Sequence, residues 1–169
     1  MYQKGQRVVY SSHGVCDIVD IETKVIDRKP VEYFVLAPID QSGARFYVPT
    51  VNPVALEKMR PILTKDELDS LLRSEETARD TWITDENRRK TMYRELISRG
   101  SRADLICMIR MLYRHKAEQL AAGRKFHLCD ENFLRDAENL LSSEFSLVLG
   151  IEKNRVGSYI ESVFEKGHC

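Results

Sequence analysis

Two His–Cys pairs are the residues whose types and spacing come closest to a reactive site. His13 and Cys16 stand three residues apart, and His127 and Cys129 stand two apart. Imidazole and thiolate are ligands that zinc prefers, but a structural zinc site uses repeated Cys-x-x-Cys spacing, which this sequence lacks. We therefore expect no metal site and no cofactor.

Cys107 is the third candidate for reactivity. It lies within the apolar run Leu105–Ile109, where a cysteine is more often a small buried hydrophobe than a nucleophile. The sequence contains no Gly-rich phosphate loop, no Gly-x-Ser-x-Gly elbow and no His-Glu-x-x-His helix. We expect no catalytic residue, no small-molecule substrate and no enzymatic activity.

A block of positive charge is the stronger signal. The chain has 26 basic and 26 acidic side chains, but residues 88–125 hold eleven basic residues against three acidic ones. A basic block between two acidic segments suits an anionic partner. A helix here would project its arginines outward to neutralise phosphates, which predicts nucleic-acid binding without sequence specificity. The candidate contacts are Arg88, Arg89, Lys90, Arg94, Arg99 and Arg102.

Trp82 is the only tryptophan and precedes this basic block by six residues. A lone tryptophan most often packs in a core. An exposed indole beside arginines can instead act as a wedge against unpaired bases. The neighbours, among them Asp80, Thr81 and Asp85, would form a poor wall for a buried ring, so we favour the wedge and keep the core as the alternative.

The elements that must position these residues change in type near residue 60. Residues 1–60 show about five short strands, with turns at Ser11–Gly14 and Asp40–Gly43. So many short strands in so few residues predict a small closed barrel of the Tudor or SH3 kind. The strand Arg45–Val48 is expected to present a free edge to a partner strand.

Residues 61–169 show the periodicity of helices instead. Strands followed by helices, without alternation, predict an α+β protein with a barrel domain over 1–60 and an all-α helical bundle over 61–169. Helices are expected to begin at caps and to end at glycines. The expected signals are the capping box Thr64–Glu67, the caps Thr84 and Ser101, the glycines Gly100 and Gly123, and helices over about 130–149 and after Gly150.

The composition limits the cellular compartments and partners that we expect. No apolar run approaches the roughly 20 residues that a membrane span needs, so no membrane partner is expected. The four cysteines are scattered, which predicts free thiols in a reducing compartment. The first residues carry no signal-peptide core, and we expect a cytoplasmic protein.

Several segments together resemble a known family. The combination is similar to that of CarD/CdnL-type bacterial transcription regulators, whose RNA-polymerase-interacting domain also resembles that of the transcription-repair coupling factor. The matching segments in the first part are Gly5-x-x-Val-Val-Tyr10, His13-Gly-Val15, Ile21–Glu22 and Glu32–Leu36. Those in the second part are Trp82, Arg88–Arg89, Glu95–Ile97 with Gly100, Leu112–Tyr113 through Lys116, and Phe133–Leu134 with Ala137–Leu141.

The resemblance implies partners and a mechanism. It implies a Tudor-like barrel that adds its sheet to the RNA polymerase β subunit, with Lys24, Arg45, Tyr47 and Val48 at the contact. It also implies a helical domain that touches promoter DNA at the upstream edge of the transcription bubble. There Trp82 would act as a wedge that stabilises the open complex.

Two other functions stay open at this point. The protein could be an adaptor, associated with polymerase or ribosome, whose basic helices bind RNA or another protein. A thiol or metal sensor built on the cysteines and histidines is disfavoured by their spacing.

Overall fold

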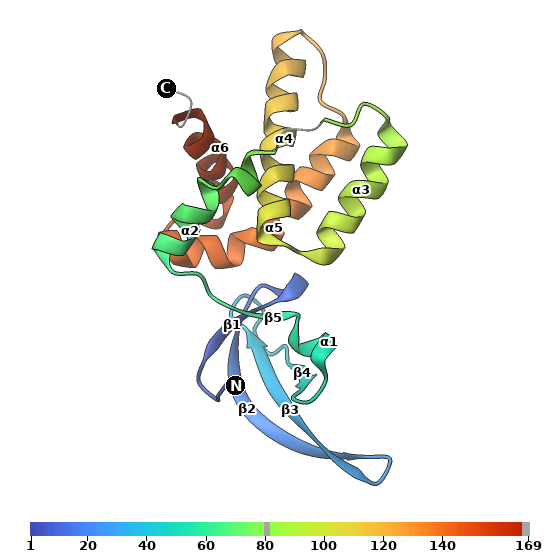
Figure 1. Cartoon of the computed structure of the whole chain (residues 1–169), viewed down its shortest axis with the longest axis vertical. Helices are drawn as coiled ribbons and strands as arrows, with labels where there is room; N and C mark the ends of the chain where they lie inside the picture. The colour runs from blue at the N-terminus through green and yellow to red at the C-terminus, as the bar shows by residue number, and fades with distance from the viewer. Residues whose placement is uncertain (80–81, 167–169) are drawn as a thin grey trace. The chain divides into compact units, whose positions relative to one another are not determined.

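The computed structural model describes residues 1–79 and 82–166. The chain divides into two compact units, Met1–Ile62 and Leu63–Cys169. All described strands lie in the first unit and all the long helices in the second, so the predicted α+β class is confirmed (Figure 1). No helix in the described part of the chain is both long and apolar enough to cross a membrane.

The first unit is built on one antiparallel sheet. Its strands have the order β4-β3-β2-β1-β5. A 3-10 helix, η1 (Ser11–His13), and a short helix, α1 (Pro53–Leu56), complete the described elements of this unit. The strands are β1 (Arg7–Tyr10), β2 (Val15–Ile26), β3 (Lys29–Pro38), β4 (Phe46–Pro49) and β5 (Met59–Pro61).

The prediction of a closed barrel is wrong. The edge strands β4 and β5 each pair with one neighbour only, β3 and β1 respectively. They are four and three residues long, and no ladder between them is found among the described residues. The sheet therefore keeps two edges, one of which is β4, as expected for the strand around Arg45–Val48.

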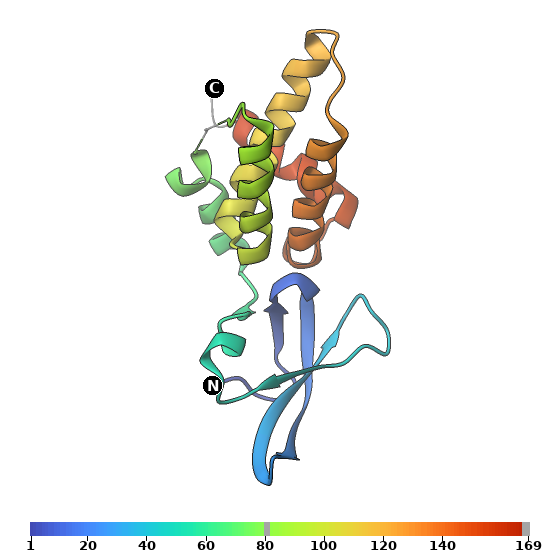
Figure 2. The same cartoon turned by 90° about the vertical axis from the view of Figure 1, so that its right-hand side faces the viewer.

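The hairpin of β2 and β3 is the longest element of the first unit. Its ladder runs from Cys16↔Pro38 to Ile26↔Lys29, with a bulge between Ile18 and Asp20. The paired ends project as a twisted ribbon beyond the rest of the sheet (Figures 1 and 2). Asp27 and Arg28 form the tip, both with positive φ, as a two-residue hairpin turn requires. Neither residue is a glycine or asparagine, so this turn has only a weak signature in the sequence.

One face of the sheet is apolar and holds the core of the first unit. Its fully buried side chains include Ile18, Leu36 and Val48. Since residues directly opposite on neighbouring strands share a face, the register Phe34↔Val48 places these side chains on the core side. The register Val35↔Tyr47 places Tyr47 on the opposite side, which we call the outer face.

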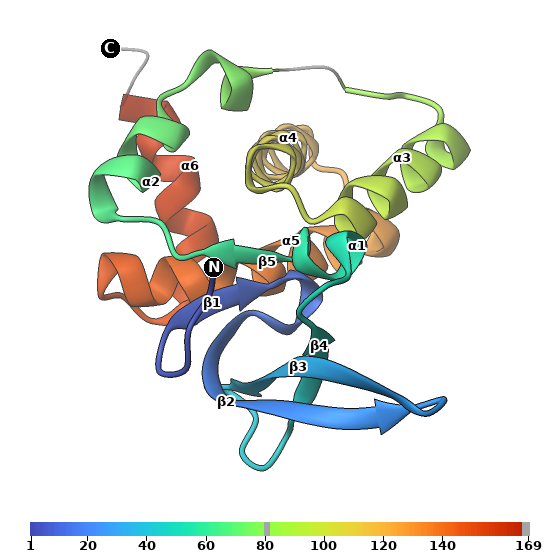
Figure 3. The ribbon, with the colours of Figure 1, turned by 60° about the horizontal axis from the view of Figure 1, so that its bottom comes forward.

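The second unit is a helical bundle around α4 (Arg102–Ala121). Figure 3 shows α4 nearly along its axis, with the other helices around it. Its buried residues, such as Ile106, Ile109 and Leu112, belong to the second core, which also takes Leu141 and Phe145 from α5. The other elements are α2 (Lys65–Leu72), η2 (Glu75–Ala78), α3 (Glu86–Arg99), α5 (Leu128–Leu149), η3 (Lys153–Arg155) and α6 (Val156–Lys166).

Most of the predicted helix boundaries are confirmed. Thr64 and Glu67 form the capping box of α2, and Ser101 caps α4. Gly100 ends α3 with φ 63°, and its N–H donates to the Leu96 carbonyl at 3.0 Å. The predicted cap Thr84 is wrong, because Asp85 Oδ1 accepts the N–H of Arg88 at 2.8 Å and so satisfies the first turn of α3.

Candidate functional site

Three side chains from three neighbouring strands meet on the outer face of the sheet. Lys24 of β2 places its Nζ 3.4 Å from the centre of the Tyr47 ring of β4. Tyr33 of β3 lies between these strands, with its ring 6.3 Å from that of Tyr47 in an edge-to-face arrangement. We call Lys24, Tyr33 and Tyr47 the outer-face cluster. A cationic and aromatic cluster of this kind suits a protein partner, because tyrosine is enriched at interface centres.

The family resemblance implied two members of this cluster and missed the third. Lys24 and Tyr47 were expected at a contact, and the structure brings them together. Tyr33 was missed because Glu32–Ala37 reads as a continuous apolar run, in which the two faces of the strand are hard to separate. The signal that could have found it is the alternation of Tyr33 with the buried residues Phe34 and Leu36.

The edge strand β4 offers backbone groups beside the cluster. The N–H of Thr50 donates to the Glu32 carbonyl at 2.9 Å, so Thr50 and, two residues earlier, Val48 turn their backbone groups toward β3. The N–H and C=O of Tyr47 then point away from β3, where no strand of the described chain pairs with them. This arrangement allows a partner strand to extend the sheet.

The other two residues expected at this contact, Arg45 and Val48, do not belong to the outer-face cluster. Arg45 precedes β4 and is exposed, with Nη1 donating to the Ala44 carbonyl at 2.8 Å. The Val48 side chain is fully buried in the first core. It cannot reach a partner there, and its backbone groups face β3, so Val48 holds β4 in the sheet and does not contact a partner.

In the second unit, Trp82 is neither fully buried nor free. Its indole stacks on the His115 ring of α4, with centres 3.7 Å apart and an angle of 19° between the planes. The side chain is half-buried and packs against the second core. One ring face is therefore occupied by His115, and the guanidinium carbon of Arg89 lies 4.7 Å from the indole centre, so a base can stack only on the remaining part of the indole. Asp80 and Thr81, which we expected to leave the indole exposed, lie outside the described residues.

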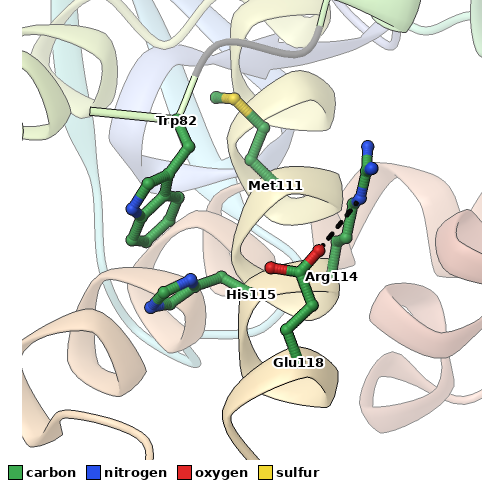
Figure 4. A pocket seen from close by; sticks show the side chains of 5 residues that line it. All are labelled: Trp82, Met111, Arg114, His115 and Glu118. Atoms are coloured by element: carbon green, nitrogen blue, oxygen red, sulfur yellow. Dashed lines mark ion pairs between the residues drawn. The ribbon is translucent and has the colours of Figure 1, made fainter. Parts of the chain in front are cut away.

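A hollow of about 270 Å³ opens beside this stack. Figure 4 shows Trp82 and His115 on one side of it, with Arg114 and Glu118 on the other. Arg114 Nε and Glu118 Oε1 form an ion pair at 3.4 Å. With Met111, the α4 residues share one surface of that helix because they are three or four positions apart.

Arg89 does not project outward, and that expectation is wrong. Its Nε and Nη2 donate to the two carboxylate oxygens of Asp130, each at 2.9 Å, and both side chains are almost completely buried. Nη1 donates to the Ile83 carbonyl at 2.9 Å. With its donors used internally, Arg89 is not available to a phosphate.

Arg102 is also committed to an internal ion pair. Its Nε and Nη2 donate to the Glu144 carboxylate at 2.8 and 2.7 Å. Glu144 is buried and also accepts the N–H of Leu63 at 2.9 Å. The pair therefore joins α4 and α5 to the first residue of the second unit, so Arg102 stabilises the fold at this position.

The remaining basic candidates are accessible but do not form one stripe. Arg88 and Arg94 are exposed, Lys90 pairs with Glu86, and Arg99 lies 4.0 Å from Glu95. At 100° per residue, Arg88 and Arg94 lie about 120° apart around α3. A second hollow, lined by both Ile83 and Arg88, connects the Arg88 side of α3 to the segment that carries Trp82.

The histidines and cysteines that were considered as reactive groups make separate local contacts. His13 stacks on Phe46 at 3.9 Å, and burial raises the pKa of the Cys16 thiol to about 11. Cys107 Sγ donates to the Glu76 carbonyl at 3.1 Å, and burial raises its pKa also. Across residues 1–79 and 82–166, no group of three or more possible ligands is arranged to hold a metal ion.

An open sheet with a polar and aromatic outer face beside the unpaired edge of β4 is the kind of surface that protein-interaction modules use. Residues 2–63 match the family model of the CarD-like/TRCF RID domain. The first unit therefore belongs to this family of RNA-polymerase-interacting domains, as the sequence resemblance predicted. The match does not extend into the helices of the second unit. No curated protein matches the chain.

Proposed function

We propose that the protein is a non-enzymatic transcription regulator that binds RNA polymerase and promoter DNA. The observation that carries the proposal is the match of residues 2–63 to the polymerase-interacting family. The first unit binds the polymerase β subunit through the outer-face cluster and the free edge of β4. The backbone groups of Tyr47 supply sheet pairing, and the side chains of Lys24, Tyr33 and Tyr47 supply specificity.

The second unit binds promoter DNA near the upstream edge of the bubble and stabilises the open complex. Its contacts are the free part of the Trp82 indole and the accessible basic residues Arg88, Lys90, Arg94 and Arg99. Only exposed cations can release counterions from DNA, so Arg89 and Arg102 are not included. Arg88 lines a hollow together with Ile83, the residue that follows Trp82, which favours this side of α3.

The DNA contact is tested by the salt dependence of binding to fork-junction DNA. The double variant Arg88→Ala, Arg94→Ala should flatten the plot of log affinity against log salt by roughly 0.9 for each phosphate that the variant no longer neutralises. Glu57→Ala, an exposed residue of the first unit, is the control. An unchanged slope would contradict the placement of DNA on α3. Tighter binding of structured RNA than of fork DNA would favour the adaptor function instead.

A further inference from the structure

Trp82 is held from two helices at once. His115 of α4 stacks on the indole at 3.7 Å. From α3, the guanidinium carbon of Arg89 lies 4.7 Å from the indole centre, within the range of a cation–π interaction. Arg89 also bonds the carbonyl of Ile83, the residue that follows Trp82. Both the ring and the adjoining backbone are therefore fixed.

Arg89 can act as a rigid support because Asp130 fixes it in turn. The bidentate pair has two bonds of 2.9 Å, and the exposed fractions of the two side chains are only 6% and 1%. Such a fork fixes the plane of the guanidinium as well as its position. Because Asp130 belongs to α5, Arg89 fixes Trp82 relative to α5, although Trp82 and α5 are far apart in sequence.

His115 lies among charges of both signs. The charged and titratable groups that face it are Arg89 from α3, Asp130 and His127 at the start of α5, and Glu118 on α4. Burial lowers the pKa of His115 despite the two carboxylates. The imidazole is therefore mainly neutral near pH 7. A neutral ring also suits a close stack on the indole beside a buried arginine.

We propose that Arg89 and His115 are positioning residues for Trp82, which hold the indole in one orientation before DNA arrives. This inference rests on the proposed DNA contact. An indole that is free in solution must be ordered when it binds, and ordering one large side chain weakens affinity by about two- to tenfold. The two supports remove that loss in advance.

The first test uses the fluorescence of the full chain, since Trp82 is its only tryptophan. In His115→Ala, emission should shift to longer wavelength and acrylamide should quench it more strongly than in the wild type. His115→Phe keeps a stacking ring and should restore the wild-type behaviour. His127→Ala removes a nearby exposed histidine and is the control. Equal quenching in His115→Ala and the wild type would overturn the proposal.

The second test uses pH, because a protonated imidazole quenches a stacked indole. Wild-type emission should fall as the pH is lowered through the titration of His115, while His115→Phe should show no such step. His127→Ala should retain the step. A step that persists in His115→Phe would show that a group other than His115 causes it and would contradict His115 as the quencher of Trp82.

Arg89 is tested by a conservative change. Arg89→Lys keeps a charge near Asp130 but cannot also bond the Ile83 carbonyl, so emission should shift in the same direction as in His115→Ala. Arg88→Lys, the exposed neighbour, should leave it unchanged. Circular dichroism checks that each variant is folded. A folded Arg89→Lys protein with wild-type emission would remove Arg89 from the proposal.

Fork-DNA binding connects the placement of the ring to the proposed function. His115→Ala should weaken binding by about two- to tenfold and have no further effect in a Trp82→Ala background, since coupled residues are not additive. An equal loss in that background would overturn positioning, because His115 would then act on DNA directly. If Trp82→Ala leaves fork binding unchanged, the proposed wedge fails, while the fluorescence results still decide whether the ring is held.

Discussion

Lys24 and Tyr47 lie two strands apart in the sheet, yet the ammonium of Lys24 sits 3.4 Å from the centre of the Tyr47 ring. Tyr33 occupies the strand between them and packs its ring edge-to-face with that of Tyr47. The contact fixes the exposed tyrosine without burying it in the core. A pre-ordered aromatic side chain beside a free strand edge is a good anchor for a partner.

The buried pair of Arg89 and Asp130 should matter far more for stability than any exposed arginine of α3. Arg89→Met leaves the Asp130 carboxylate buried without its partner, which should cost about 3–5 kcal/mol of unfolding free energy. The adjacent variant Arg88→Met should change it by less than about 0.5 kcal/mol. Urea unfolding followed by helical circular dichroism measures both. Similar midpoints for the two variants would contradict the internal role of Arg89.

Gly157 of α6 lies against the hydrogen bond that Tyr113 Oη donates to Glu138 Oε1. A Cβ at this position would lie 1.8 Å from Glu138 Oε1 and 2.7 Å from Tyr113 Oη. Gly157→Ala should therefore destabilise the second unit by about 1–3 kcal/mol, against the usual benefit of alanine in a helix. The loss should shrink in a Glu138→Ala background. Ser158→Ala, at the next and exposed position, serves as the control, and a loss equal to that of Gly157→Ala would argue against the close packing.

The stability of the second unit should depend on His115 as the pH falls. Burial holds the pKa of His115 below its ordinary value, whereas in the unfolded chain it titrates near about 6.5. The unfolded state therefore binds the proton first, and the stability present above that pKa is lost as the pH falls below it. The difference in urea midpoint between about pH 7.5 and pH 5.5 should be smaller in His115→Phe than in the wild type. Equal differences would show that other groups cause the loss.

Local signals in the sequence predicted the ends of helices well. The capping box Thr64–Glu67 and the terminator Gly100 work within one or two helical turns, and both are present. Arg88 and Arg89 look equivalent in sequence, but only Arg89 is buried, because its partner Asp130 comes 41 residues later. Arg89 stands four residues before the buried Tyr93, so the two residues lie on one face of α3. That spacing was the signal that could have predicted a buried Arg89.

Sheet closure and the outer-face cluster depended on register, which short strands specify poorly. The bulge near Ile18 and the turn at Asp27–Arg28 set that register, and neither has a strong sequence signal. Lys24 and Tyr47 could be chosen by resemblance. Their direct contact, with Tyr33 packed beside Tyr47, depends on the alignment of the three strands.

The most direct test of the proposed function is the affinity of the full chain for RNA polymerase when Tyr47 carries a charge. Tyr47→Glu places a carboxylate within the outer-face cluster and should weaken binding by at least about 1–3 kcal/mol, roughly a 5- to 150-fold rise in Kd. Leu147→Glu is the matched control, because Leu147 and Tyr47 are both 42% exposed and Leu147 lies in the second unit. We expect weakened binding for Tyr47→Glu alone. A folded Tyr47→Glu protein that binds polymerase as tightly as the wild type would contradict the placement of the polymerase contact on the outer face.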